Sequence, residues 1–162
     1  MSATVEIAVE SPRWSVLPAA EAVVRGAVEA ALVDCGEGHA EVSIVLADDA
    51  QIRDLNHRWR GKDSATNVLS FPAPDSPHDK ARFLGDIILA FETIEREAAD
   101  EAKPLAHHVA HLAVHGTLHL LGYDHENDSD ADAMERRERD ILARIGVPDP
   151  YASDAAKRTE PA

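Results

Sequence analysis

The stretch that decides the fold reads Pro104-Leu-Ala-His-His-Val-Ala-His-Leu-Ala-Val-His-Gly-Thr-Leu-His-Leu-Leu-Gly122 and continues as Tyr-Asp-His125. Proline is tolerated at a first helical position and glycine commonly ends a helix, so we expect one helix from Pro104 to about Leu121. Twenty residues from Pro104 to Tyr123 carry no formal charge, which is about the length of a bilayer span. Five of them are histidines, which argues against a membrane segment. The stretch therefore predicts a central helix of a globular domain.

The rest of the chain predicts a small sheet with helices packed against it. Alternating and short apolar runs indicate four strands, near Val5–Val9, His39–Ala47, Val68–Phe71 and Phe83–Phe91. Apolar spacing and capping residues indicate four further helices, from Pro18 to about Val33, from Asp48 to Gly61, from Glu92 to about Ala102, and from near Ser129 to about Ile145. This order predicts an α+β fold in which a small four-stranded mixed sheet packs with about five helices, with a metal site at the end of the central histidine-bearing helix.

Length and composition indicate one domain. The chain has 162 residues, of which 44% are hydrophobic, and this is enough for one core that needs no disulfides. We find no repeat and expect a single domain over residues 1–150. The segment Pro72–Lys80 contains three prolines and predicts a surface loop, and residues 151–162 are small and polar and predict a disordered tail.

The charge balance restricts the partners and the compartment. Sixteen Lys and Arg stand against thirty Asp and Glu, a formal net charge of -14, so generic attachment to nucleic acid or to an anionic membrane is not expected. Any polyanion would have to find a local basic site. The single cysteine, Cys35, cannot form an intramolecular disulfide, and the N-terminus lacks the pattern of a secretory signal. We therefore expect a cytoplasmic protein.

Three histidines have the spacing of a metal site. His115 and His119 lie four residues apart, so on a helix they project from the same face and can reach one ion. Gly122 can end the helix in a left-handed turn that aims His125 at the same point. Three neutral imidazoles leave the fourth position of a tetrahedral zinc ion open for water, whose pKa would fall to roughly 7. The pattern predicts one catalytic Zn²⁺ held by these three side chains.

Residues that support the ligands are harder to identify from the sequence. A ligating imidazole usually donates its other N–H to a carboxylate or a carbonyl group. Asp86 and Asp124 are the candidates, although turn formation alone would also explain Asp124. The helix also carries His107, His108 and His111, which we interpret as surface or packing residues with at most a supporting role.

Two other zinc enzyme classes are disfavoured. The spacing of His115, His119 and His125 matches the metzincin protease signature, but that signature requires Glu directly after the first histidine as general base. This chain has Gly116 there, which can neither accept a proton nor orient a water. A zinc deaminase needs cysteine ligands that Cys35 alone cannot provide.

A second segment carries a local excess of positive charge. Between Arg53 and Lys62 four basic residues meet one acid, in a chain that is acidic overall. Arg58, Trp59 and Lys62 are candidates for RNA contact, because cations suit phosphates and an indole suits base stacking. Cations that complement the dipole of a helix C-terminus are the alternative explanation.

The motifs together resemble those of the YbeY family of metal-dependent endoribonucleases, also called rRNA maturation factors. The resemblance rests on His115-Gly-x-Leu-His119-x-x-Gly122-Tyr-Asp124-His125, Leu55-Asn-x-x-x-Arg60-Gly61-Lys62-Asp63, Thr66-Asn-Val-Leu-Ser-Phe-Pro72 and Leu84-Gly85-Asp86-Ile87. It implies that the three histidines are zinc ligands and that Arg60 is catalytic, with His115 both a ligand and part of the catalytic centre. Ala65 and Trp59 stand where many members have Pro and Tyr, and we expect the zinc chemistry to be unaffected.

The resemblance also implies a function and partners. The expected activity is single-strand cleavage in small-subunit (16S) rRNA maturation and ribosome quality control. Ribosomal proteins of the small subunit and a ribosome-associated GTPase are the expected partners, and no DNA is expected. Two alternatives stay open: a ribosome-assembly factor with a non-catalytic metal site, and a metalloprotease-like peptide hydrolase. The nucleophile, a zinc-activated water or the substrate 2′-OH, also stays open.

Overall fold

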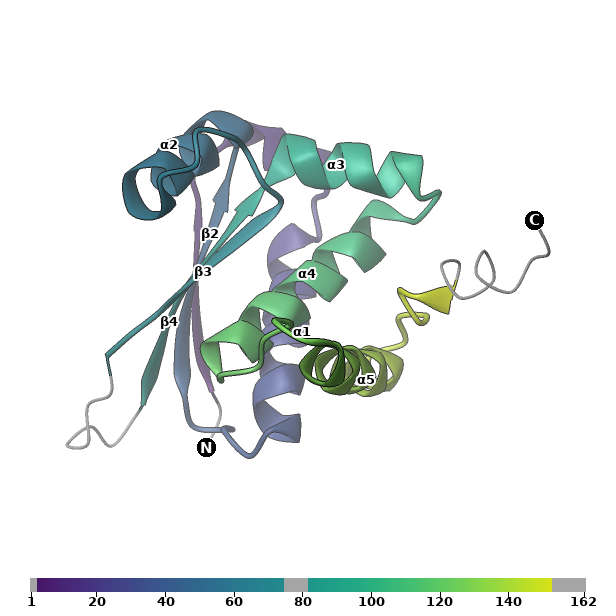
Figure 1. Ribbon diagram of the computed structural model, residues 1–162. Coiled ribbons are helices and arrows are strands. Elements are labelled where there is room, and N and C mark those ends of the chain that lie inside the picture. Colours follow the sequence, from purple (N-terminus) through teal and green to yellow (C-terminus); the bar gives the residue numbers. More distant parts are fainter. Residues whose placement is uncertain (1–2, 75–81, 153–162) are drawn as a thin grey trace.

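The structure is a computed structural model, and it describes residues 3–74 and 82–152 (Figure 1). The strands are β1 (Thr4–Val9), β2 (Glu41–Ala47), β3 (Val68–Pro72) and β4 (Phe83–Ala90). A short 3-10 helix, Pro12–Val16, precedes the α-helices, which are α1 (Ala20–Asp34), α2 (Asp49–Arg60), α3 (Phe91–Asp100), α4 (Leu105–Leu120) and α5 (Asp128–Arg144). The predicted α+β class, with a four-stranded mixed sheet and five α-helices, is confirmed.

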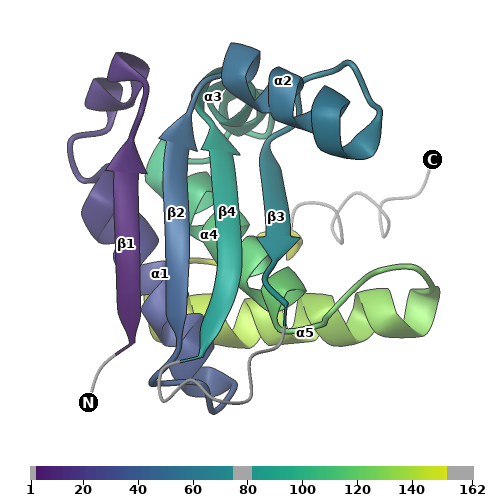
Figure 2. The ribbon, with the colours of Figure 1, turned by 90° about the vertical axis from the view of Figure 1, so that its left-hand side faces the viewer.

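The sheet has the order β1-β2-β4-β3 (Figure 2). Strands β1, β2 and β4 are parallel, and β3 runs antiparallel to β4 at the edge of the sheet. The parallel pairs require crossover connections, which α1 and α2 supply, whereas β3 pairs with the strand that follows it in sequence. The edge strand β3 is important for the site because α4 packs beside it.

The main core lies between the sheet and α1, α4 and α5, which gather on one face (Figure 1). Alternate side chains of the central strands point into this core and are almost fully buried: Val42, Ile44 and Leu46 on β2, and Ile87 and Leu89 on β4. The opposite face carries a smaller cluster, in which Ile52 of α2 packs on Leu69, Ile88 and Ala90. The helix α4 therefore lies within the core, which explains why it is apolar on most sides.

The helix ends differ from prediction by a few residues. The first α-helix begins at Ala20, two residues after Pro18. Helix α5 begins one residue before Ser129, because Asn127 caps it by accepting a hydrogen bond of 2.8 Å from the backbone N–H of Asp130. Pro104 is the residue before α4 and not its first helical residue.

The predicted surface loop and the predicted C-terminal tail lie partly outside the described residues. Residues 75–81 of the expected loop and 153–162 of the expected tail are outside the described residues. Tyr151 is described, and its hydroxyl donates a 2.7 Å hydrogen bond to Glu138 of α5. None of the helices in the described part of the chain combines the length and apolar character that crossing a bilayer requires.

Candidate metal centre and active-site cleft

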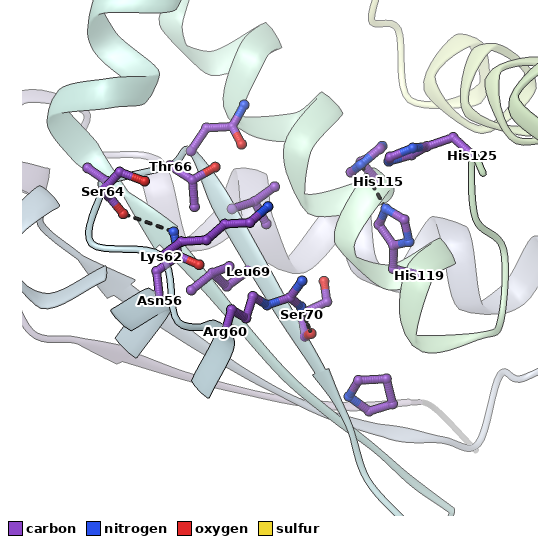
Figure 3. A pocket seen from close by; sticks show the side chains of 14 residues that line it. Asn56, Arg60, Lys62, Ser64, Thr66, Leu69, Ser70, His115, His119 and His125 are labelled. Carbon is purple, nitrogen blue, oxygen red and sulfur yellow. Dashed lines mark hydrogen bonds between the residues drawn. The ribbon is translucent and has the colours of Figure 1, made fainter. Parts of the chain in front are cut away.

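The three predicted ligand histidines lie together at the C-terminal end of α4 (Figure 3). His115 and His119 share one face of the helix, and their ring centroids are 4.5 Å apart. Gly122 follows with a φ of 99°, a left-handed conformation that favours glycine and turns the chain back. This turn brings the ring of His125 to 5.2 Å from that of His119. One nitrogen from each of the three rings lies within 4.8 Å of the others, a spacing that could hold one metal ion.

Hydrogen bonds determine which ring nitrogen carries the proton in His115 and in His119. The Nδ1 of His119 lies 2.9 Å from the backbone carbonyl oxygen of Tyr123, and the Nδ1 of His115 lies 3.1 Å from a carboxylate oxygen of Glu138. A carbonyl and a carboxylate oxygen only accept, so both Nδ1 atoms must donate. In the neutral rings, both Nε2 atoms are therefore unprotonated and available as ligands.

The two unprotonated Nε2 atoms of His115 and His119 face each other at 3.0 Å. Two lone pairs at this separation repel unless a cation or a shared proton lies between them. Burial, followed by the charges of His115 and His125, lowers the pKa of His119 and so favours the neutral ring that metal binding needs. The residues present therefore fit a metal ion, and imidazole ligands suit a transition metal such as zinc better than magnesium or calcium.

Glu138 contacts this ligand set through His115, and sequence reasoning missed it. It lies on α5 with a side chain that is 1% exposed, and it accepts hydrogen bonds from His115, His111 and Tyr151. Burial alone would raise its pKa, but the hydrogen bonds from the two histidines outweigh burial and lower the pKa to about 2. The side chain is therefore an ionised carboxylate. A signal was present in the sequence, because Glu138 lies four residues after Met134 and three before Ile141, within the apolar stripe of α5.

Among the described residues, no hydrogen bond joins Asp86 or Asp124, the two residues predicted to support the ligands, to a ligand histidine. Asp86 precedes Ile87 on β4, and successive strand side chains point to opposite faces. Ile87 packs beside Gly116 of α4, so Asp86 lies on the face of the sheet away from the histidines. Asp124 accepts a hydrogen bond of 3.3 Å from the backbone N–H of Glu126, which is the alternative turn role considered for it.

Two of the other histidines on α4, His108 and His111, contact carboxylates of neighbouring helices. The Nε2 of His108 lies 2.9 Å from Glu97 of α3, and the side chain is 6% exposed, so it packs as predicted and joins α4 to α3. For His111 the sequence allowed at most a supporting role near the ligands. Its Nε2 lies 2.9 Å from the same Glu138 oxygen that contacts His115, which is consistent with that role.

The ligands form one wall of a cleft of about 580 Å³ (Figure 3). The other wall consists of the end of α2, the loop after it and β3, and the residues that line the cleft from these elements are Asn56, Arg60, Lys62, Ser64, Ala65, Thr66, Asn67, Val68, Leu69, Ser70 and Pro72. Two contacts hold the loop in place. The buried Asn56 donates a hydrogen bond of 2.9 Å to the carbonyl oxygen of Ser64, and Arg53 pairs with Asp63 at 2.7 Å.

Ser70 connects the two walls. Its hydroxyl donates a hydrogen bond of 3.2 Å to the carbonyl oxygen of Gly116 on α4, and its own carbonyl oxygen accepts one of 3.1 Å from Nη2 of Arg60. The guanidinium of Arg60 also lies over the ring of Phe71, 5.7 Å from its centroid. The catalytic candidate Arg60 is thus held on β3 and faces the cleft that the histidines line.

The three RNA-contact candidates divide in the structure. Lys62 lines the cleft. Trp59 does not, and its side chain is 70% exposed. Arg58 pairs with Asp54 at 2.7 Å one turn earlier on α2, in the manner of a solvated helix face. Only Lys62 of the three is placed beside the ligands.

The packing around Gly116 leaves no room for the glutamate that a metzincin protease carries at this position. A Cβ atom at this position would lie 2.9 Å from Cγ2 of Ile87 and 3.2 Å from Oγ of Ser70. The helix therefore packs against β4 and β3 too closely for a side chain at position 116. This geometry adds to the argument from the sequence against a metalloprotease.

Comparisons with known proteins agree with the motifs. A family model described as "Endoribonuclease YbeY" matches residues 7–146. Endoribonuclease YbeY of Nitrobacter hamburgensis is 54% identical over 154 residues, which cover 91% of this chain and 81% of that protein. Endoribonuclease YbeY of Rhodopseudomonas palustris strain BisA53 is 56% identical over 153 residues, which cover 91% of this chain and 89% of the relative.

A solved structure has the same fold. It is the solution structure of a Thermotoga maritima protein, with a TM-score of 0.54 and 21% sequence identity, covering 98% of this chain and 99% of that one. At this identity the likeness concerns the fold alone. The family model and the relatives carry the assignment: this chain belongs to the endoribonuclease YbeY family.

Proposed function

We propose that this protein is a zinc-dependent endoribonuclease that cuts single-stranded RNA. One observation carries the proposal: the unprotonated Nε2 atoms of His115 and His119 lie 3.0 Å apart in the wall of a cleft that Arg60 and Lys62 also line. A metal-ligand set opposite two cations suits a substrate that is an anionic phosphodiester. The endoribonuclease name of the family agrees with this reading.

Zinc is the ion proposed for the three histidines. Three imidazoles from His115, His119 and His125 would leave one coordination position open, which is typical of catalytic and not of structural zinc sites. A bound zinc ion supplies Lewis-acid chemistry, either by polarising a phosphoryl oxygen or by lowering the pKa of a water. The protein contributes fixed tautomers, because Glu138 and the Tyr123 carbonyl group hold the Nδ1 protons of His115 and His119 away from the ion.

Arg60 is proposed to stabilise the charge that develops on the reacting phosphate. A guanidinium has five N–H donors in a planar fork, and one of them donates to Ser70. This bond and the contact with Phe71 restrict the side chain, while the remaining donors are available to a phosphate in the cleft. A donor that is already oriented stabilises a transition state without the cost of reorganisation.

The proposed preference for single strands follows from the size of the cleft and its exposed rim. A volume of about 580 Å³ lies within the range of small-ligand sites, so it admits a short extended segment of RNA and not the full width of a duplex. Lys62 would contact a phosphate within the cleft. The exposed Trp59, which directly precedes Arg60 in sequence, would offer a stacking surface to a base that lies outside the cleft.

We further propose a role in 16S rRNA maturation and ribosome quality control in the cytoplasm, by one domain over residues 1–150. The formal net charge of -14 supports the view that targeting depends on a partner, because binding to bulk RNA would be weak. Small-subunit ribosomal proteins and a ribosome-associated GTPase are the proposed partners.

The decisive experiment uses purified full-length protein and precursor rRNA, with and without a chelator, beside His119→Ala. We expect cleavage by the wild type only, its loss on chelation, and its return when zinc is added. Cleavage that resists the chelator would contradict the proposal and indicate a contaminating nuclease. Absence of cleavage with every metal would favour an assembly factor whose metal site is not catalytic, and cleavage of a generic peptide would favour a hydrolase of another class.

A further inference from the structure

A buried carboxylate joins three separate parts of the chain behind the histidine ligands. Oε2 of Glu138 on α5 lies 3.1 Å from Nδ1 of His115 and 2.9 Å from Nε2 of His111, both on α4. Its Oε1 accepts a hydrogen bond of 2.7 Å from the hydroxyl of Tyr151, in the segment that follows α5. Three donors therefore satisfy one carboxylate that is 1% exposed.

We propose that Glu138 is a positioning residue for the metal centre, and that Tyr151 and His111 hold it in place. It acts through His115: by accepting the Nδ1 proton, it keeps the ring in the tautomer that presents Nε2 to the ion and fixes the ring orientation. The inference rests on the proposed metal site and deepens it. It also gives the segment after α5 a role in that site.

The burial of Glu138 makes this role specific. Since the side chain is shielded from solvent, water does not replace its protein partners, and a missing donor would leave a buried charge under-satisfied. The three hydrogen bonds therefore fix the positions of the carboxylate and of its donors relative to one another. Of the two helical ligands, His115 has a side-chain partner for its Nδ1, whereas His119 uses a backbone carbonyl group that mutation leaves in place.

The same atoms do not form a second metal site. His111, His115 and Glu138 do offer three ligand atoms within 4.8 Å of one another. Each contact here joins a ring N–H donor to a carboxylate acceptor, however, whereas the Nε2 atoms of His115 and His119 are both acceptors. An ion in this cluster would require His115 to lose its Nδ1 proton while its Nε2 faces His119. The cluster is better explained as a hydrogen-bonded support for one ion.

The position of Tyr151 is also fixed by its surroundings. Nζ of Lys103, before α4, donates a hydrogen bond of 2.8 Å to the carbonyl oxygen of Pro150. The guanidinium of Arg139 lies over the Tyr151 ring, 5.9 Å from its centroid. The hydroxyl is thereby directed to Glu138, and burial together with that carboxylate keeps it protonated as a donor.

The test compares Glu138→Gln with Asp140→Asn, which neutralises an exposed carboxylate two residues further along the same helix. Zinc affinity is measured on the metal-free proteins by competition with a chromophoric chelator. An amide has one oxygen in place of two and is a weaker acceptor, so we expect Glu138→Gln to bind zinc about 10- to 100-fold more weakly. Asp140→Asn should bind as the wild type does.

A second readout is the tautomer of His115 in metal-free wild type, determined by nitrogen NMR above pH 7. The inference requires the Nδ1–H form, and a predominant Nε2–H form would overturn it. Should Glu138→Gln fail to fold, Tyr151→Phe replaces it, because this variant removes only one hydroxyl and should still weaken zinc binding several-fold.

The outcomes separate this inference from the proposed function. If the wild type binds no zinc, the proposed function fails first. If the wild type binds zinc and both Glu138→Gln and Tyr151→Phe bind it with unchanged affinity, only the positioning role is overturned. Weaker zinc binding by Glu138→Gln and Tyr151→Phe, with unchanged zinc binding by Asp140→Asn, supports the positioning role.

Discussion

The two walls of the cleft are built in different ways. On the histidine wall, His115 and His119 have their Nδ1 protons held by a buried carboxylate and a backbone carbonyl group. The opposite wall carries the cations Arg60 and Lys62 and is called here the cationic wall. Its lining residues Arg60, Lys62, Ser64 and Ala65, at the end of α2 and in the loop after it, are exposed. The histidine wall is therefore preorganised for an ion of fixed geometry, whereas the exposed Lys62 side chain on the cationic wall can adjust to a flexible strand.

Arg60 is the exception on the cationic wall, and Ser70 explains why. The carbonyl oxygen of Ser70 holds Arg60, and its hydroxyl reaches the carbonyl oxygen of Gly116 on the opposite wall. The residue expected to meet the reacting phosphate is thus the one linked to the ligand helix. The contrast predicts that ligand changes abolish metal binding, that Arg60 changes affect catalysis alone, and that loss of the Lys62 side chain has a small effect.

The largest effect is expected from His119→Ala. The variant removes one of three ligands, so zinc binding should weaken by more than the roughly 100-fold upper range typical of residues that only support ligands. Elemental analysis of the purified protein should find zinc near zero and RNA cleavage at background. His107→Ala is the matched control, because it removes a histidine of the same helix that lies outside the ligand group. Stoichiometric zinc in His119→Ala would show that the ligand assignment is wrong.

Arg60→Ala should come next. Loss of one donor that stabilises transition-state charge typically costs about 2.7–4 kcal/mol, so cleavage should slow by about 100- to 1,000-fold while zinc content stays at the wild-type level. Single-turnover rates on a short RNA measure the effect. Arg58→Ala is the control, and a change of a few fold is expected because that side chain pairs with Asp54 on the solvated face. Equal rates for Arg60→Ala and wild type would remove Arg60 from the mechanism.

Gly116→Ala tests the contact between the walls. A Cβ there meets Ile87 at 2.9 Å, so the free energy of unfolding should fall by about 1–3 kcal/mol in urea denaturation. Gly26→Ala in α1 has no atom within 4 Å of its added Cβ and should instead raise stability by about 0.5–1 kcal/mol. Similar signs for the two variants would mean that α4 does not pack on β3 and β4 as described.

The smallest effect is expected from Lys62→Ala. If Lys62 contacts a phosphate as proposed, the variant should bind RNA more weakly for all sequences and reduce the salt slope of binding by about 1. Arg144→Ala, which removes a cation paired with Asp34 and absent from the cleft lining, should leave the slope unchanged. An unchanged slope in Lys62→Ala would place the RNA backbone elsewhere.

Much of the fold and the clustering of the three proposed ligand histidines could be predicted, because both depend on local sequence. The four-residue spacing of His115 and His119 places them on one helical face, and Gly122 allows the return of the chain to His125. These relations need no knowledge of how distant elements pack. The order of helices and strands could be predicted for the same reason, because each element is indicated by its own stretch of sequence.

The acid within the apolar stripe of α5 indicates a buried Glu138, but its partners could not be identified from the sequence, because they depend on packing between elements distant in sequence. Glu138 lies 23 residues after His115 and meets it only because α5 packs on α4. Tyr151, placed in the expected tail, reaches the same carboxylate. Asp86 carries a carboxylate that could accept a hydrogen bond from a ligand histidine. Successive side chains of β4 point to opposite faces of the sheet, however, so Ile87 contacts α4 and Asp86 lies on the other face.

The most direct test of the account is a zinc titration of metal-free wild-type protein, with the rate of single-stranded RNA cleavage as the readout. We expect no cleavage without metal, and a cleavage rate that rises with added zinc and saturates at one equivalent per chain. Cleavage by the metal-free protein, or a zinc-loaded protein that leaves RNA intact, would contradict it.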